Sequence, residues 1–258
     1  MRAIASDSSP EQHVRVRRAR VGEFGAELRV LVVAGIGTGV LVVGVGSRLA
    51  MFVLRLTSPD RVRGVTSDDG FTIGRFTLSG TYNLLMLGAA VGVIGAAAYQ
   101  WVRPWLLGPR WFRLVTVALA SGAVVGSMLV HADGIDFTVL EPMWLAVGLF
   151  VALPALFAVC IALAVDRLDA TDEHAAPATW RRWILPAVLA AAFPPVVVLL
   201  VVAATVLLLW VNVRDLAPVR RFVDSTAVRI VARVAWLAVA LLGLAALVGD
   251  VADLRAIA

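Results

Sequence analysis

Long uncharged runs alternate with shorter polar segments along most of the chain. There are six such runs, at residues 30–54, 82–102, 112–131, 142–165, 183–211 and 230–249, with approximate bounds. A helix rises 1.5 Å per residue, so roughly 20 apolar residues cross a hydrocarbon core of about 30 Å. The pattern therefore predicts an all-α polytopic membrane protein with about six transmembrane helices. The third and sixth runs are the shortest, so five or seven spans remain open alternatives.

The polar ends define three parts: a basic tail at 1–29, a helical bundle at 30–250 and a short tail at 251–258. A secretory signal peptide fits poorly, because the leader before the first apolar run is long and no cleavage site of small residues follows that run. We expect the first span to stay attached.

Composition agrees with a lipid environment. The chain has 258 residues, of which 60% are hydrophobic and 16% are charged, whereas soluble domains are about 45 to 50% apolar and about 25% charged. All 23 basic residues are Arg, and the formal net charge is +5. Because these arginines lie between apolar runs, membrane topology and anionic lipid explain them better than nucleic-acid binding. We expect no nucleic-acid partner.

The placement of arginines predicts an orientation in the plasma membrane. With the N-terminus in the cytoplasm, inside segments hold 13 Arg and outside segments hold 8, which favours a cytoplasmic N-terminus and C-terminus. The bias is weakened by the segment 214–229, which falls outside in this arrangement and is as basic as any inside one. The basic run in the tail predicts contacts with anionic lipid headgroups near Arg15, Arg17, Arg18 and Arg20.

Glycines recur at a spacing of four residues within three of the apolar runs. Such small-xxx-small patterns let two membrane helices approach closely. The pairs are Gly35 with Gly39, Gly88 with Gly92, and Gly122 with Gly126. We therefore expect a bundle that packs through glycine faces.

The longest polar interruption between the first two runs, 58–81, has the pattern of a short β-hairpin. Asp68-Asp69-Gly70 supplies turn chemistry, and Gly74 allows a bulge that puts the flanking apolar residues on one face. We expect this hairpin and the loop 131–141 to form an outer cap on the bundle. Ser79 or Thr81 is expected to cap the second span.

The predicted outer side also collects a candidate polar cluster, which includes arginines that lie inside spans near their ends. Its members are Arg48, Asp68, Asp69, Arg75, His131, Asp133, Asp136 and Arg233. The HxDxxD spacing from His131 is compatible with a divalent ion, but ion pairing within a tight loop is the more economical interpretation. No metal and no cofactor are expected.

Pro194 and Pro195 fall near the middle of the fifth run. Two prolines remove two amide donors and open a helix, and discontinuous helices often carry the sites of transporters. A packing kink is the simpler alternative.

Motifs of catalysis are missing from the sequence: it has no HExxH, no GxSxG and no P-loop. The leading hypothesis is a non-enzymatic structural or interaction module that contacts a membrane-protein partner, a second copy of itself or lipid headgroups. The alternatives are a small permease or channel that uses the proline break, and an outer-leaflet enzyme with His131 as base and Arg48 as an anion clamp.

Three segments, SDDGFTIGRFTLSGTYNLL, WLLGPRWFR and HADGIDFTVLEP, together resemble uncharacterised small multi-pass membrane proteins of high-GC actinobacteria. The resemblance covers roughly residues 48–165. It implies a membrane fold and location and no catalytic activity, and it suggests that the two outer segments belong to one recurring unit.

Overall fold

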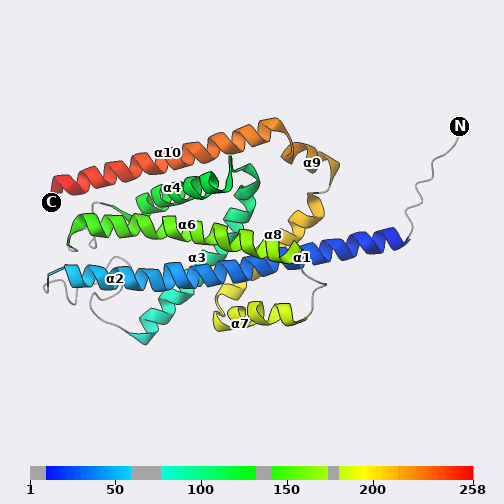
Figure 1. The fold of residues 1–258 in the computed structure, drawn as a ribbon, viewed down its shortest axis with the longest axis horizontal. Coiled ribbons are helices and arrows are strands. Elements are labelled where there is room, and N and C mark those ends of the chain that lie inside the picture. Colours follow the sequence, from blue (N-terminus) through cyan, green and yellow to red (C-terminus); the bar gives the residue numbers. More distant parts are fainter. Residues whose placement is uncertain (1–9, 60–76, 132–140, 174–179, 215, 258) are drawn as a thin grey trace.

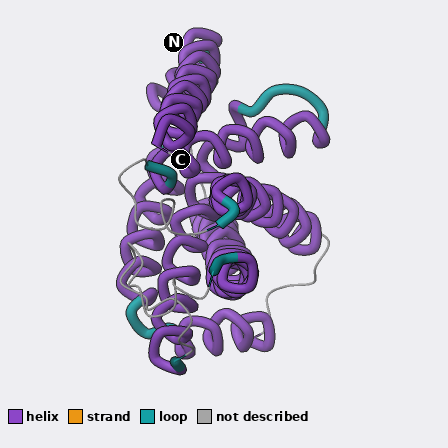
Figure 2. The backbone as a smooth tube through the Cα atoms, turned by 90° about the vertical axis from the view of Figure 1, so that its left-hand side faces the viewer, coloured by secondary structure: helices purple, strands orange, loops and turns teal. Residues whose placement is uncertain are grey.

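The computed structural model describes residues 10–59, 77–131, 141–173, 180–214 and 216–257, and all regular structure in these ranges is helical (Figures 1 and 2). Six helices are long and apolar enough to cross a membrane, as predicted. They are Arg20–Thr57, Leu78–Trp105, Arg110–Leu129, Met143–Thr171, Val196–Val213 and Thr226–Ala256. The predicted β-hairpin at 58–81 is not supported: residues 60–76 lie outside the described residues, and the described part of the segment has no strand, because Leu78–Thr81 form the first turn of a helix.

The N-terminal half of the bundle is built on one long helix crossed by a second. Helix α1 (Pro10–Thr38) continues through a π-helical turn, η1 (Gly39–Val45), into α2 (Gly46–Thr57). Helix α3 (Leu78–Val102) crosses it at glycines. A Cβ built on Gly92 would lie 1.9 Å from the carbonyl oxygen of Gly35, and one on Gly39 would lie 2.1 Å from that of Gly88. The backbones therefore touch, and the predicted glycine face is confirmed here.

Helix α3 begins earlier than the sequence suggested. Thr77 is the N-cap: its backbone is extended, and its hydroxyl accepts a hydrogen bond of 3.2 Å from the amide of Gly80. The hydroxyl of Thr81 donates instead to the carbonyl of Thr77, at 2.9 Å. The expectation that Ser79 or Thr81 caps this helix is wrong, because both lie within its first turn.

Helices α4 (Arg110–Leu129), α6 (Met143–Glu173) and α10 (Thr226–Ile257) form the other half of the bundle. Gly122 and Gly126 of α4 face Val151 of α6, and Gly243 of α10 faces the backbone of Val124. The share of the apolar window that is buried falls from 44% in Arg20–Thr57 to 6% in Thr226–Ala256. Helix α10 therefore rests mainly on α4 and presents the rest of its apolar surface outward.

The fifth apolar run is divided, not continuous. Helix α7 (Ile184–Ala192) follows a 3-10 turn, η4 (Trp180–Trp183), and a break at Phe193, Pro194 and Pro195 separates it from α8 (Val196–Val213). A short helix, α9 (Ala217–Val223), leads into α10. Figure 1 shows α7 and α8 leaving their shared turn toward the same end of the molecule. The predicted helix break at Pro194 and Pro195 is therefore present, and of the two helices in this run α8 is long enough to cross a membrane.

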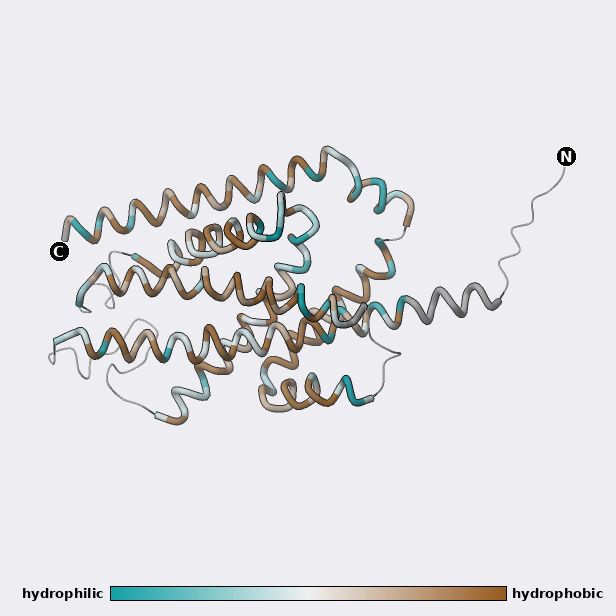
Figure 3. Tube along the Cα trace, viewed as in Figure 1, coloured by the Kyte–Doolittle hydropathy of each residue, from teal (hydrophilic) through white to brown (hydrophobic). Residues whose placement is uncertain are grey.

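The two ends of the bundle differ in polarity. Leu54, Val130, Ala146 and Leu254 pack together at one end, which we call the Ser58 end. The start of α1, the end of α6 and residue 214 lie at the other, the Glu23 end, which is the more hydrophilic one in Figure 3. Helix α1 begins and helix α10 finishes at opposite ends of the molecule (Figure 1).

Candidate functional site

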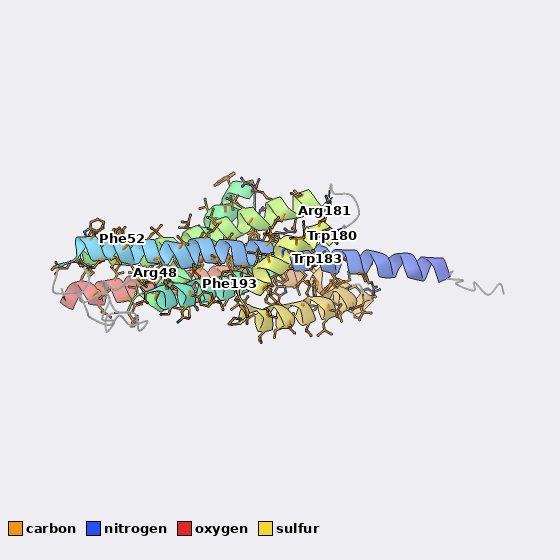
Figure 4. All side chains as sticks on the ribbon, turned by 90° about the horizontal axis from the view of Figure 1, so that it is seen from below. Arg48, Phe52, Trp180, Arg181, Trp183 and Phe193 are labelled. Atoms are coloured by element: carbon orange, nitrogen blue, oxygen red, sulfur yellow. The ribbon has the colours of Figure 1, made fainter. Side chains whose placement is uncertain are left out.

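The structure does not bring the two in-span arginines of the predicted polar cluster together. Arg48 lies on α2, toward the Ser58 end (Figure 4). Arg233 lies near the start of α10, where its Nε donates a hydrogen bond of 3.3 Å to the carbonyl oxygen of Trp105. Trp105 belongs to η3 (Arg103–Trp105), a 3-10 turn at the C-terminal end of α3. Arg233 therefore belongs to the Glu23 end.

Of the remaining members of that cluster, the structure describes only His131. His131 is exposed at the end of α4, and its Nδ1 lies 3.0 Å from the carbonyl oxygen of Leu129. The other members lie outside the described residues: Asp68, Asp69, Arg75, Asp133 and Asp136. In the described ranges, no three His, Cys, Asp or Glu side chains gather in a way that would hold a metal ion.

One contact links the two segments that were expected to form the outer cap. The hydroxyl of Ser58 donates to the carbonyl oxygen of Glu141 at 3.2 Å and accepts from the amide of Glu141 at 2.9 Å. Ser58 is only 7% exposed. A single hydroxyl thus joins the first residue after α2 to the residue that precedes Pro142 and α6. Because both backbone groups of Glu141 are engaged, the relative position of the two connections is fixed here.

The densest charged arrangement is at the other end of the bundle. Asp166 and Asp169 lie one turn apart on α6, after the last apolar residues of its span. Arg103 pairs with Asp169 and lies 3.7 Å from Asp166, while Arg110 of α4 approaches the second oxygen of Asp166 at 3.8 Å. The hydroxyl of Tyr99 donates to Asp166 at 3.3 Å. These contacts hold α3, α4 and α6 together at one level.

A second ion pair fixes the helical hairpin to the first helix. Arg214, the residue after α8, pairs with Glu23 and lies 3.6 Å from Glu27 on the next turn of α1. Its side chain is 29% exposed, so water screens the pair only in part. We call the two groups of contacts together the Glu23-end ion network.

Sequence reasoning missed this network. Its arginines entered the sequence analysis only as topological charges, and no pairing of them with acidic residues was predicted. A signal was present: Asp166 and Asp169 are spaced i, i+3, and Glu23 and Glu27 are spaced i, i+4, so each pair shares one helical face. Helices that extend past the apolar runs by one or two turns bring those faces together.

The ion pairs of the network have a structural role: they connect neighbouring helices. Each of the four carboxylates, on Glu23, Glu27, Asp166 and Asp169, has a guanidinium within salt-bridge distance. Arginine suits such partly buried pairs, because its planar fork is weakly hydrated and stays charged. The groups neutralise one another across helix boundaries, so their evident effect is to hold helices in register.

The second candidate site, the proline break, is part of the bundle interior. Phe193 packs on the main hydrophobic cluster, and Val196, the first residue of α8, is 1% exposed. The amides of Val196 and Val197 donate to the carbonyls of Phe193 and Pro194, each at 3.0 Å. The prolines have no amide hydrogen, so the carbonyls four residues before them, on Ala190 and Ala191, lose their usual helical donors.

These features define the class of the protein: a multi-pass membrane protein whose described part is an α-helical bundle, fastened by polar contacts at both ends. Comparisons with protein-family models, with curated proteins and with solved structures find no match for this chain. They do not bear on the resemblance to actinobacterial membrane proteins, which stays a prediction.

Proposed function

We propose that the chain is a non-enzymatic protein of the plasma membrane, whose connections at the Ser58 end act as one outer cap that contacts a partner membrane protein. In this proposal the Glu23 end faces the cytoplasm. The resemblance to uncharacterised actinobacterial membrane proteins is compatible with such a role.

The observation that carries the proposal is the double hydrogen bond between Ser58 and Glu141. It joins two residues that are 83 positions apart in the chain: Ser58 begins the connection after α2, and Glu141 ends the connection before α6. The hydroxyl is nearly buried, so it fixes Ser58 against Glu141, the residues at which the two connections begin and end. A surface built from two segments can distinguish a partner by its shape, because that shape depends on both segments.

The experiment compares Ser58→Ala with Ser127→Ala. The control also loses one hydroxyl, but Ser127 bonds only within its own helix, to the carbonyl of Val124 at 2.9 Å. Ser58→Ala is expected to lower stability by about 1 to 3 kcal/mol, because it leaves polar backbone groups without their partner, and to reduce the yield of cross-linked partners. A triple variant, Asp68→Asn, Asp69→Asn and Asp136→Asn, tests the cap surface. Unchanged stability, abundance and partner yield in the triple variant would refute the cap.

A small permease or channel is the second candidate, favoured by the break between α7 and α8. The prolines remove the two amides that would bond the carbonyls of Ala190 and Ala191 in a continuous helix, and backbone carbonyls at the ends of broken helices serve as cation ligands in transporters. Cation flux through proteoliposomes is then expected to fall when Pro194→Ala and Pro195→Ala are combined, and to persist in Pro218→Ala at the exposed start of α9. Absence of flux in the unaltered protein would end this candidate.

A further inference from the structure

The two ends of the α7–α8 hairpin contact the same short stretch of α1. Trp183, just before α7, lies beside Gly25, where an added Cβ would be 3.4 Å from the indole. Arg214, just after α8, pairs with Glu23 and contacts Glu27. Gly25 lies midway between these two glutamates. The start of α7 and the end of α8 therefore lie at the same level along α1.

The first arm of the hairpin is too short to cross the membrane. Helix α7 has 9 residues, or about 14 Å, against a hydrocarbon core of about 30 Å. Helix α8, with 18 residues, is long enough to cross, so the return of the chain to one face rests on the contacts of Trp183 and Arg214 with α1. The turn is displaced along the long axis from the start of the hairpin: Figure 4 shows Phe193 closer to Arg48 than Trp180, Arg181 and Trp183 are. Irregular backbone at membrane depth is tolerated where protein buries it, and Val196 at this turn is 1% exposed.

This geometry changes the distribution of charge between the two faces. The segment 214–229, with four arginines, now joins the face that carries the N-terminal tail. That face then holds 16 Arg, and the opposite face holds 5, including Arg255 near the C-terminus. The sequence alone had suggested 13 against 8. The larger asymmetry is what the positive-inside rule leads one to expect.

Both ends of the hairpin also combine arginine with exposed aromatic side chains. Before α7, Arg181 is exposed between Trp180 at 72% and Trp183 at 38%. After α8, Arg220 and Arg221 are exposed beside Phe222 at 67%. Aromatic side chains are enriched at the level of the lipid headgroups, and guanidinium groups bind phosphate. Both segments therefore have the side chains that bind phospholipid headgroups.

We propose that α7 and α8 form a re-entrant hairpin, and that the basic aromatic segments at its two ends, Trp180–Trp183 and Arg220–Phe222, bind anionic phospholipid headgroups on the N-terminal face. The chain then crosses the membrane five times, and its C-terminus lies on the face opposite the N-terminus. The cap proposal concerns the other face, so either proposal can fail without the other.

Topology is tested with single cysteines in the full chain, after the one native cysteine is removed as Cys160→Ala. Gly22→Cys and Thr57→Cys report the two faces; both positions are exposed. Asp224→Cys and Ala256→Cys are the test positions. In intact cells, a membrane-impermeant maleimide is expected to label Ala256→Cys together with Thr57→Cys, and to label Asp224→Cys only when Gly22→Cys is labelled, after permeabilisation. Labelling of Asp224→Cys together with Thr57→Cys would overturn the hairpin.

Lipid binding is tested by thermal unfolding in phosphatidylglycerol and in phosphatidylcholine nanodiscs. Phosphatidylglycerol is expected to raise the unfolding temperature, and the variant Arg181→Gln, Arg182→Gln, Arg220→Gln and Arg221→Gln is expected to lose more than half of that rise. The control removes four arginines from the opposite face: Arg55→Gln, Arg61→Gln, Arg63→Gln and Arg255→Gln. It is expected to keep most of the rise. An equal loss in both variants would refute the assignment of lipid binding to the hairpin ends.

Discussion

At the scale of single residues, the glycines at the crossing of α1 and α3 matter because they have no side chain. Backbone atoms occupy the space where a Cβ would be, so the adjustment required is a movement of whole helices and not of a flexible side chain. Hydrophobic burial contributes little to helix association in lipid, and close backbone packing takes its place.

Gly92→Ala is therefore expected to destabilise the protein by about 1 to 3 kcal/mol, the usual cost of overpacking. The added methyl group would lie 1.9 Å from the carbonyl oxygen of Gly35. Thermal unfolding of the purified protein in detergent measures the effect. The matched control is Gly37→Ala on α1, where nothing lies within 4 Å of an added Cβ. If the two variants unfold at the same temperature, the crossing does not depend on direct backbone contact.

At the scale of helices, the Glu23-end ion network sets the register between elements that apolar packing alone leaves free to slide. When an apolar helix in lipid rotates or slides along its neighbour, its packing energy changes little. A guanidinium and a carboxylate on two helices form their ion pair only in a few relative positions of those helices. Arg103 is the central group, since it joins the end of α3 to both acids on α6.

A double-mutant cycle isolates this contribution. Arg103→Gln and Asp169→Asn are each expected to destabilise the protein, and the double variant is expected to cost less than their sum by about 1 kcal/mol, because the side chains are partly exposed. Chemical unfolding in mild detergent supplies the free energies. Arg167→Gln is the control on the same helix, because its exposed side chain lies between the two acids in sequence. Additive single effects would mean that the contact does not contribute to stability.

The same scale shows what the sequence could predict. Apolar length and glycine spacing were sufficient to identify the spans and the α1–α3 crossing, because both are local properties of a helix. The relative direction of α7 and α8 could not be predicted from local sequence. Pro194 and Pro195 predict a break in the helix, but a kink and a reversal of chain direction have the same sequence pattern. The outcome depends on the contacts of Trp183 and Arg214 with α1, which lie more than 150 residues away in the chain. Likewise, the hydrogen bond from Arg233 to Trp105 joins residues 128 positions apart, and no local pattern in the sequence indicates it.

At the scale of the whole molecule, one end carries most of the interfacial chemistry. The tryptophans follow the arginines, and most of them lie near the Glu23 end: Trp101, Trp105, Trp111, Trp180, Trp183 and Trp210. Trp236 lies one turn after Arg233 on α10. Trp144 lies at the start of α6, at the Ser58 end, and is 71% exposed. In a single crossing at 183–211, Trp210 would lie with Trp144; in the hairpin it lies just before Arg214, beside Glu23.

This asymmetry predicts how the intrinsic fluorescence responds to a quencher on each side of the membrane. In proteoliposomes sorted for one orientation, iodide, which does not cross the bilayer, is expected to quench most of the accessible emission when it is on the side of the N-terminus. On the other side it should reach mainly Trp144, because indoles in the headgroup layer are open to the nearby aqueous phase and those across the hydrocarbon core are not. Trp144→Phe is expected to abolish the smaller response and leave the larger one intact. Equal quenching from the two sides would contradict the concentration of tryptophan at the Glu23 end, and with it the shared level of the two ends of the α7–α8 hairpin.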